Sequence, residues 1–431
     1  MRKLISLFAV STLLLAGCSS DEPTVTTEMP DISMSSKRTV EDAIAIASQY
    51  ARPVENLQGR STALSVDVTS VTPIVKHTSR SNSDTLMYAV DFADNNGYVI
   101  VSANKATEPI LAIIEEGNYK ESLEIDNPGF NQFMELAENY VSTAAVIIPQ
   151  PNPDPNPNPG FDFMMTEYTD TIALRTCTGP RVKVKWNQAW PENKYCPNKI
   201  AGCSPVAIAQ VFSYCKPELD IELTFEGKPY DNLKVNWDEI IKHTKSTTYK
   251  SPAAILQTVH YNNCNANEEA HDHLAALIRE IGEQIHSDYT DNGTGSSPDI
   301  YFPYANEILS GNQPTYVTTS TLYTKLEKTG VVILRGSDKK EGGHTWVADG
   351  VASIKYNITT YYNFVPKTGK YERKEERTET KRYIRFNWGW AGSSDGYFLE
   401  GVYDPEKATP GFMYIKSRYN CDQGVFGYYY K

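Results

Sequence analysis

The chain lacks the features that would let it bind nucleic acid or hold a structural zinc ion. Its 431 residues carry a formal net charge of −12, and no run of Lys and Arg interrupts this acidic balance. Binding a polyanion requires a clustered basic surface, so nucleic acid is excluded as a partner. None of the 7 cysteines forms a CxxC pair, which argues against a zinc site and a thioredoxin-like motif. We therefore expect neither a metal nor a cofactor.

Long apolar runs are also missing, except at the N-terminus. There Met1-Arg2-Lys3 is a short basic start, and Leu4 to Leu15 is an apolar run too short to span a bilayer as a helix. The following Leu15-Ala16-Gly17-Cys18 resembles the lipobox of bacterial lipoproteins, which implies cleavage before Cys18 and lipid attachment to its sulfur. We expect an exported lipoprotein, held at the outer membrane or cell surface by this lipid, from which a mature form can be released.

The remaining chain divides into a tether, a small unit, a linker and a larger unit. Residues 19–37 are polar and form the tether. In the small unit, 38–145, Thr39 and Asp42 have capping-box spacing, and Asn96-Gly97 predicts a tight hairpin turn. Residues 146–165 are rich in Pro and Asn and favour an extended, solvated linker. We predict helices at 39–47 and 130–140 of the small unit, and strands at 86–92, 98–101 and 110–114.

The larger unit, residues 166–431, is predicted to begin with helices and to continue with strands. Helices are expected at 206–214, 253–261 and 268–286. Strands are expected at 331–335, 345–351, 356–364, 382–388, 397–402 and 424–430. A helical part followed by antiparallel strands indicates the α+β fold class, here preceded by the smaller α+β unit.

Cys203 carries the first signal of catalysis. It stands before the apolar helix expected at 206–214, with Ser204 suited to the N-cap and Pro205 to the first helical position. The partial positive charge and free N–H groups of a helix start stabilise a thiolate, which is the nucleophilic form of cysteine. The alternative interpretation is a small buried cysteine beside a core helix, so the argument needs a base elsewhere in the chain.

His344 is the best-placed base among the 7 histidines. It follows Gly342-Gly343 and opens a predicted strand, which would hold the ring rigidly. It lies 141 positions after Cys203, within the roughly 130–150 residues typical of a papain-type pair. His271 and His273 look superficially like metal ligands. Alternate positions on a helix face different directions, however, so we expect these two rings to face solvent.

Three further residues complete the predicted machinery. Asn387 can accept a hydrogen bond from the His344 ring and so fix its tautomer, while Trp388 shields that bond from water. Upstream of the nucleophile, Gln188 offers a side-chain donor that would join the Cys203 backbone N–H in an oxyanion hole. The order along the chain is therefore donor, nucleophile, base and orienting residue.

The segments around these four residues resemble the streptopain family of papain-like cysteine peptidases, and residues 38–145 resemble that family's propeptide domain. The resemblance implies a papain-like fold and a zymogen activated by a cut near residues 149–180. It implies hydrolysis of peptide bonds in proteins or peptides through a thioester acyl-enzyme, with the chain's own propeptide as a further partner. It also implies that the loop 289–297 lines the substrate cleft, and the expected substrate-binding residues are Gly295, Ser296, Gly343 and Trp390.

The sequence departs from the family pattern without losing a catalytic group. Ser204-Pro205 follows the nucleophile, Ala391 stands where Gly is usual, and a long charged segment at 356–381 is interpreted as a hairpin that gates or widens the cleft. Two alternatives to an endopeptidase stay open. The first is an inactive protease fold that binds proteins, which the complete catalytic set disfavours. The second is an amidase for cell-wall peptides, which only the family resemblance disfavours.

Overall fold

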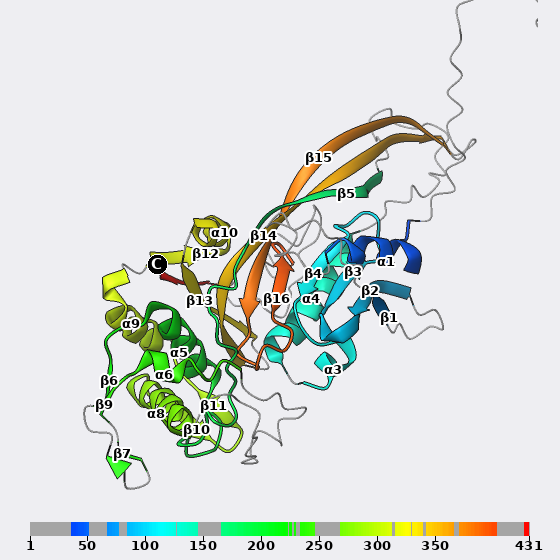
Figure 1. Cartoon of the computed structure of the whole chain (residues 1–431). Helices are drawn as coiled ribbons and strands as arrows, with labels where there is room; N and C mark the ends of the chain where they lie inside the picture. Colours follow the sequence, from blue (N-terminus) through cyan, green and yellow to red (C-terminus); the bar gives the residue numbers. More distant parts are fainter. Residues whose placement is uncertain are drawn as a thin grey trace, which may run out of the picture.

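One large antiparallel sheet runs through the molecule and connects the small N-terminal unit to the larger unit (Figure 1). The computed structural model describes residues 36–50, 67–76, 84–125, 127–144, 165–222, 224–225, 228–229, 233–245, 268–312, 315–328, 330–338, 342–365, 370–402 and 426–430. Cys18, most of the tether, the linker up to residue 164 and the helix expected at 253–261 lie outside the described residues. No helix in the described part is long and apolar enough to cross a membrane.

In the part of the small unit that the structure describes, three α-helices pack against four strands. Its predicted first helix is confirmed, because Thr39 and Asp42 form a reciprocal capping box at its start. The predicted hairpin is confirmed, because strands 84–92 and 98–102 pair antiparallel, with Asp91 opposite Tyr98. Its connection is longer than Asn96-Gly97 alone: a short 3-10 helix at Ala93–Asn95 precedes these residues, with Asp94 and Asn95 both at positive φ. The elements are α1 (Val40–Ser48), β1 (Val68–Lys76), β2 (Asp84–Phe92), β3 (Tyr98–Ser102), β4 (Ile110–Ile114), α3 (Tyr119–Leu123) and α4 (Pro128–Thr143).

The larger unit has a helical part and a strand-rich part, as the α+β expectation requires. Its described helices are α5 (Cys203–Cys215), α6 (Trp237–Ile240), α8 (Glu268–Gln284), α9 (Pro298–Ile308) and α10 (Thr319–Lys328). Its long-sheet strands are β5 (Met165–Thr178), β12 (Thr315–Thr318), β13 (Val331–Asp338), β14 (Gly342–Val365), β15 (Lys370–Asn387), β16 (Gly396–Leu399) and β17 (Phe426–Tyr430). Three short ladders pair β6 (Asp220–Ile221) with β9 (Leu233–Lys234), β7 (Thr224–Phe225) with β8 (Lys228–Pro229), and β10 (Asp288–Thr290) with β11 (Gly293–Gly295).

The two units share their sheet through one pair of edge strands. The order is β1-β2-β3-β4-β16-β15-β14-β13-β17-β12, and the join is β4 against β16, with Ile113 opposite Tyr397. At Gly396 an added Cβ would overlap the Ile113 carbonyl oxygen, so only glycine lets the two backbones approach here. The N-terminal unit therefore covers an edge strand of the larger unit, satisfying its backbone groups.

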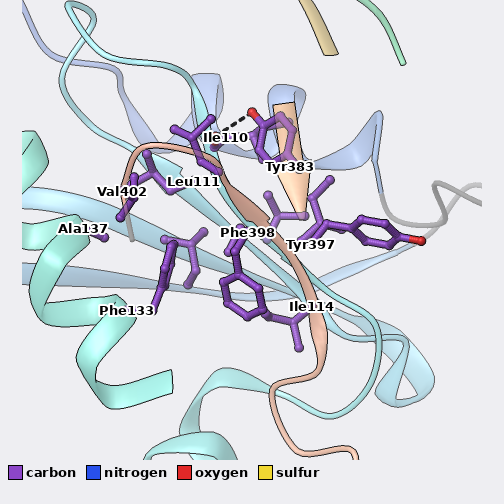
Figure 2. Close-up of a cluster of buried hydrophobic side chains, with 14 of the residues drawn as sticks. Ile110, Leu111, Ile114, Phe133, Ala137, Tyr383, Tyr397, Phe398 and Val402 are labelled. Carbon is purple, nitrogen blue, oxygen red and sulfur yellow. Dashed lines mark hydrogen bonds between the residues drawn. The ribbon is translucent and has the colours of Figure 1, made fainter. Parts of the chain in front are cut away.

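An apolar core spans this join. Phe133 and Ala137 of α4, with Leu111 of β4, pack beside Phe398 of β16 and the nearby Val402 (Figure 2). The Phe133 and Phe398 rings meet edge to face at 4.7 Å. A second cluster lies between the sheet and helices α5, α8 and α9. Because the first cluster draws side chains from both units, burial of apolar area holds the N-terminal unit in place.

The charged segment at 356–381 forms a hairpin, as predicted, but this part lies away from the catalytic residues. β14 is one long strand that covers both strands predicted at 345–351 and 356–364. It pairs with β15 on one side and β5 on the other, and the three strands extend beyond the body of the molecule (Figure 1). Tyr356 is twelve strand residues beyond His344, roughly 40 Å along an extended chain. The predicted role as a gate at the cleft therefore has no geometric support.

Candidate active site

Cys203, the predicted nucleophile, lies in the first turn of a buried helix. Helix α5 begins at Cys203 itself, with Gly202 as N-cap at φ 91°. The prediction of Ser204 as N-cap is therefore wrong, because its hydroxyl instead bonds the Thr345 hydroxyl at 3.0 Å across to β14. Cys203 is partly exposed, and its thiol interacts with the His344 side chain and the Thr345 backbone, both in β14.

His344 lies near the start of β14, where its backbone pairs with Gly336 of β13. The side chain is buried, and its Nε2 lies 3.0 Å from the backbone carbonyl oxygen of Trp388. A carbonyl oxygen can only accept, so Nε2 carries the proton and donates. Nδ1 is then the ring nitrogen available to take a proton from the thiol of Cys203.

The electrostatics favour a thiolate at Cys203. Burial raises the pKa of this thiol, but the hydrogen bond with the His344 ring and the charge of that ring outweigh burial. The Thr345 backbone and the Ser204 hydroxyl add smaller stabilising contacts, and the net pKa is lowered to about 7. Burial instead raises the pKa of Cys215, at the other end of the same helix, to about 12. The pKa of the Cys203 thiol is therefore well below that of the thiol at the other end of the same helix.

Asn387 does not orient the imidazole, which corrects the sequence prediction. Its side-chain nitrogen donates to the Val184 carbonyl at 3.0 Å, and its side-chain oxygen accepts from the Gly389 backbone at 3.1 Å. Asn387 thereby shapes the turn that presents the Trp388 carbonyl to His344. Sequence reasoning missed this acceptor because it is a backbone atom, which every residue possesses.

Trp388 is held from several directions. Its backbone N–H donates to a side-chain oxygen of Asp395 at 2.9 Å, and its indole N–H donates to the Ser394 carbonyl at 3.1 Å. The centroid of its ring lies 6.4 Å from that of the His344 ring, but the His344–Asn387 hydrogen bond that Trp388 was predicted to shield is not formed. Burial raises the pKa of Asp395 to about 7. Ala391, which replaces a glycine of the family pattern, adopts φ 54° in this loop.

Gln188 lies on a braced loop beside the nucleophile. Its backbone carbonyl accepts from the Ala201 N–H at 2.9 Å, which places this loop against the residues leading into Cys203. The fully buried Glu192 accepts from the Asn187 backbone at 3.1 Å and stabilises the turn. The Gln188 side chain is partly exposed.

The residues predicted to bind substrate lie at different places around the site. Gly343 is exposed beside His344, and Gly295 is exposed at the end of β11. Ser296 bonds Ser287 at 2.9 Å. Trp390 packs against the apolar core that the two units share. Nothing in this geometry connects the four residues to a single subsite.

The 289–297 loop reaches the nucleophile through Thr294. Its hydroxyl donates to the Ile200 carbonyl at 2.7 Å, and its side chain packs against Gly202, where an added Cβ would overlap it. The loop therefore supports the backbone that leads into Cys203. Sequence reasoning also missed Tyr301, whose hydroxyl lies 3.2 Å from that of Thr345 behind the catalytic pair.

His271 is buried, contrary to the prediction that it faces solvent. Its ring packs edge to face against Trp190 at 4.8 Å and against His243 at 5.0 Å. Burial lowers the pKa of both histidines, that of His243 to about 3, so both are neutral near pH 7. Among the described residues, no group of three His, Cys, Asp or Glu side chains could hold a metal ion.

The comparisons with known proteins identify the two units. Residues 185–398 match the Peptidase C10 family, and residues 35–141 match the Spi protease inhibitor family. Residues 185–398 belong to the Peptidase C10 family. Streptopain from Streptococcus pyogenes is 22% identical over 352 residues, which cover 75% of this chain and 76% of streptopain, and the serotype M1 protein is 23% identical over the same length. The chain is thus a cysteine peptidase that carries a propeptide-type inhibitor domain.

Two solved structures from Prevotella intermedia are also similar. A fragment of prointerpain A has 18% identity and a TM-score of 0.47, and the match covers 83% of this chain and 97% of the fragment. Active interpain A has 17% identity and a TM-score of 0.35, covering 58% and 94%.

The inhibitor domain of this C10 peptidase reaches His344, the predicted base. At Gly129, in the first turn of α4, an added Cβ would overlap the Trp388 ring and lie 3.0 Å from Cδ2 of His344. The neighbouring Asn127 donates to the Ser393 carbonyl at 3.3 Å. A substrate could not occupy this side of His344 while α4 is in place, so the described arrangement is that of a zymogen.

The pKa of Cys203 predicts how this thiol reacts in the peptidase. Below pH 7 the thiol is protonated, so alkylation by iodoacetamide should slow about tenfold per pH unit, and above pH 7 it should level off. Cys215 should still be unreactive at pH 8, because burial raises its pKa. Peptide mass spectrometry after timed alkylation of the unfragmented protein measures both rates. Equal rates at Cys203 and Cys215 would contradict an activated nucleophile.

Proposed function

We propose that the chain is the precursor of a cysteine endopeptidase that cuts protein substrates through a thioester acyl-enzyme. One observation carries the proposal: the Cys203 thiol, with a pKa of about 7, meets a histidine whose other ring nitrogen is fixed by the Trp388 carbonyl. This arrangement supplies a nucleophile and a base of known tautomer. It is the minimum requirement for nucleophilic catalysis by cysteine.

The chemistry follows from the positions of these groups. The Cys203 sulfur attacks the carbonyl carbon of the scissile bond, and negative charge develops on the carbonyl oxygen. The Cys203 backbone N–H at the helix start and the Gln188 amide are the donors assigned to this oxygen, each worth about 10²–10³ in rate. His344 gives its Nδ1 proton to the departing amine, which leaves a thioester. It then takes a proton from water, which attacks the thioester and releases the acid and the free thiol.

Activation requires removal of the inhibitor domain. Residues 165–178 form β5, which pairs along β14, so a cut within them would need the ladder to open. We therefore narrow the expected cut from 149–180 to the segment before Met165. Such a cut leaves β5 attached to the catalytic unit, and it separates the catalytic unit from α4 and β4 of the inhibitor domain.

The test compares two substrates. The precursor lacking residues 1–18 is incubated under reducing conditions, with added protease if it stays whole, and followed by gel and intact mass. We expect a cut before Met165, then degradation of casein but not of purified peptidoglycan. If only peptidoglycan is degraded, the endopeptidase hypothesis is rejected in favour of the cell-wall peptide amidase. If the cut protein degrades neither substrate and Cys203 is unreactive, the inactive protein-binding fold becomes the favoured hypothesis.

We further propose that the precursor is exported and anchored through lipid on Cys18. The support is the sequence pattern alone, because Cys18 lies outside the described residues. Cells producing the native chain or a Cys18→Ser variant are fed a radioactive fatty acid. Label on the native chain alone supports the anchor, whereas equal labelling of the two, or none, rejects it.

A further inference from the structure

A carboxylate of the inhibitor domain is clamped between two lysines of the catalytic unit. Glu116 follows β4, and its two carboxylate oxygens each meet a separate ammonium group. Lys245 Nζ lies 2.6 Å from one oxygen, and Lys185 Nζ contacts the other. Burial raises the pKa of Glu116, but the two lysines outweigh burial and lower it. The carboxylate is therefore charged, and the site is built to hold that charge.

Both lysines are positioned by the catalytic unit. The Lys185 backbone donates to the Thr244 carbonyl at 2.7 Å, which sets the two lysine-bearing segments side by side. The Lys185 stem packs on Gly392, where an added Cβ would lie 2.6 Å from its Cδ. Its side chain is only 18% exposed. A lysine restrained in this way loses less side-chain entropy on binding a carboxylate than a free surface lysine does.

The clamp lies beside segments that the mechanism uses. Lys185 precedes Trp186, whose carbonyl accepts from the Ala391 backbone at 3.1 Å. One strand-like segment thus leads from Lys185 to Gln188, and the loop containing Gly392 leads back to Trp388. In the precursor, a cavity of about 460 Å³ adjoins the clamp at the boundary between the two units, where Glu116 and Glu121 of the inhibitor domain face Lys245 and Gly392 of the catalytic unit. A chain that enters the catalytic site from this side would pass the two lysines.

Elsewhere in the contact between the two units, the charges have the same arrangement as in the clamp. The inhibitor domain supplies Glu115 to Arg385 at 2.7 Å and Glu108 to Lys381 at 3.0 Å, so carboxylates again meet cations of the catalytic unit. Departure of the domain leaves Lys185 and Lys245 without the Glu116 carboxylate that contacts both of them in the precursor. An acidic side chain of another polypeptide is the ligand that matches them in charge and shape.

We propose that Lys185 and Lys245 form a carboxylate-binding subsite of the mature enzyme, which takes an Asp or Glu side chain of the protein substrate and is filled by Glu116 in the precursor. The inference rests on the proposed function. Two ammonium groups on flexible stems act as point charges rather than a rigid fork, so both acidic residues should fit. Because the clamp is partly exposed, we expect about a fivefold preference over the uncharged amide, decreasing with salt.

The experiment uses the matured enzyme and peptides in matched pairs. Each pair has Glu or Gln at one position, scanned over four residues on either side of the scissile bond. We expect kcat/KM to favour Glu about fivefold at one position, and to lose this preference at high ionic strength and in a Lys185→Gln, Lys245→Gln double variant. The Glu-to-Gln ratio of kcat/KM is compared within each variant, so that a general change in activity affects both peptides equally and cancels. Lys216→Gln is the control, because Lys216 pairs with Asp238 at the end of α5.

A binding measurement distinguishes failure of the proposed subsite from failure of the proposed endopeptidase function. The matured Cys203→Ala form is titrated with the same Glu and Gln peptides, carrying a fluorophore, and the two Kd values are compared. A Glu preference in binding that the double variant loses supports the subsite even if no peptide is cut. Cleavage without a Glu preference at any position, or a preference that survives in the double variant, overturns the subsite and leaves the endopeptidase standing.

Discussion

Replacing Cys203 by alanine is expected to abolish peptide-bond hydrolysis without unfolding the protein. The sulfur is the atom that forms the thioester, and no other described group can replace it. Removing a catalytic nucleophile elsewhere costs about 10³-fold or more in kcat. The side chain is partly exposed and small, so the free energy of unfolding should change by less than about 1 kcal/mol.

The measurement is hydrolysis of casein or a fluorogenic peptide by the matured protein, with thermal unfolding run in parallel. Cys215→Ala is the matched control: it removes a partly exposed thiol from the same helix, whose pKa burial raises. We expect it to keep full activity. If Cys203→Ala kept more than about a hundredth of the native rate, cysteine nucleophilic catalysis at this position would be wrong.

Replacing Arg385 by alanine should give the largest loss of stability. Arg385 is fully buried in β15, and it bonds Asp349 at 2.6 Å and the inhibitor domain's Glu115 through two nitrogens at 2.7 and 3.0 Å. Asp349 is also fully buried. Alanine leaves these carboxylates without their cation in a low-dielectric interior, which costs about 3–5 kcal/mol. We expect Tm of the precursor to fall by at least roughly 6 °C.

The control for this prediction is a second arginine of the same strand. Arg377→Ala removes an exposed ion pair with Glu379, for which about 0–1 kcal/mol is expected. Glu115→Gln then tests the part that concerns the two units: it should lower the Tm of the precursor, because it removes the charge that pairs with Arg385 across the contact. If Arg385→Ala and Arg377→Ala lowered Tm equally, the buried ion pairs would contribute no more to stability than an exposed pair does.

The sequence could single out the proposed catalytic pair because each member stands in a recognisable local pattern. Cys203 precedes an apolar run with Pro at its start, and His344 follows two glycines and opens an alternating strand. Their separation along the chain matches the papain arrangement. The orienting group could not be found in this way. Asn387 has the right side chain, but its hydrogen bonds are used within its own turn, and the acceptor is the Trp388 carbonyl.

The conformation of the loop that follows Trp388 directs the Trp388 carbonyl toward His344. The loop after Trp388 holds Gly389, Ala391, Gly392 and Ser394 at positive φ, and Asp395 binds the Trp388 N–H. Such a sequence predicts a turn, but not which carbonyl points at a histidine 44 residues away. The burial of His271 escaped prediction for a similar reason, since its neighbours Trp190 and His243 come from distant segments.

By itself, the sequence determined the class of chemistry, the division into two units and most of the element types. These depend on local patterns: apolar periodicity, capping residues, proline content and the spacing of a few reactive side chains. Tertiary structure alone decided that β4 completes the catalytic unit's sheet at β16, that Gly129 lies against His344, and that Glu116 occupies a two-lysine clamp. Each of these is a contact between segments far apart in the chain. Edge strands and surface charges look alike in sequence, and only packing chooses their partners.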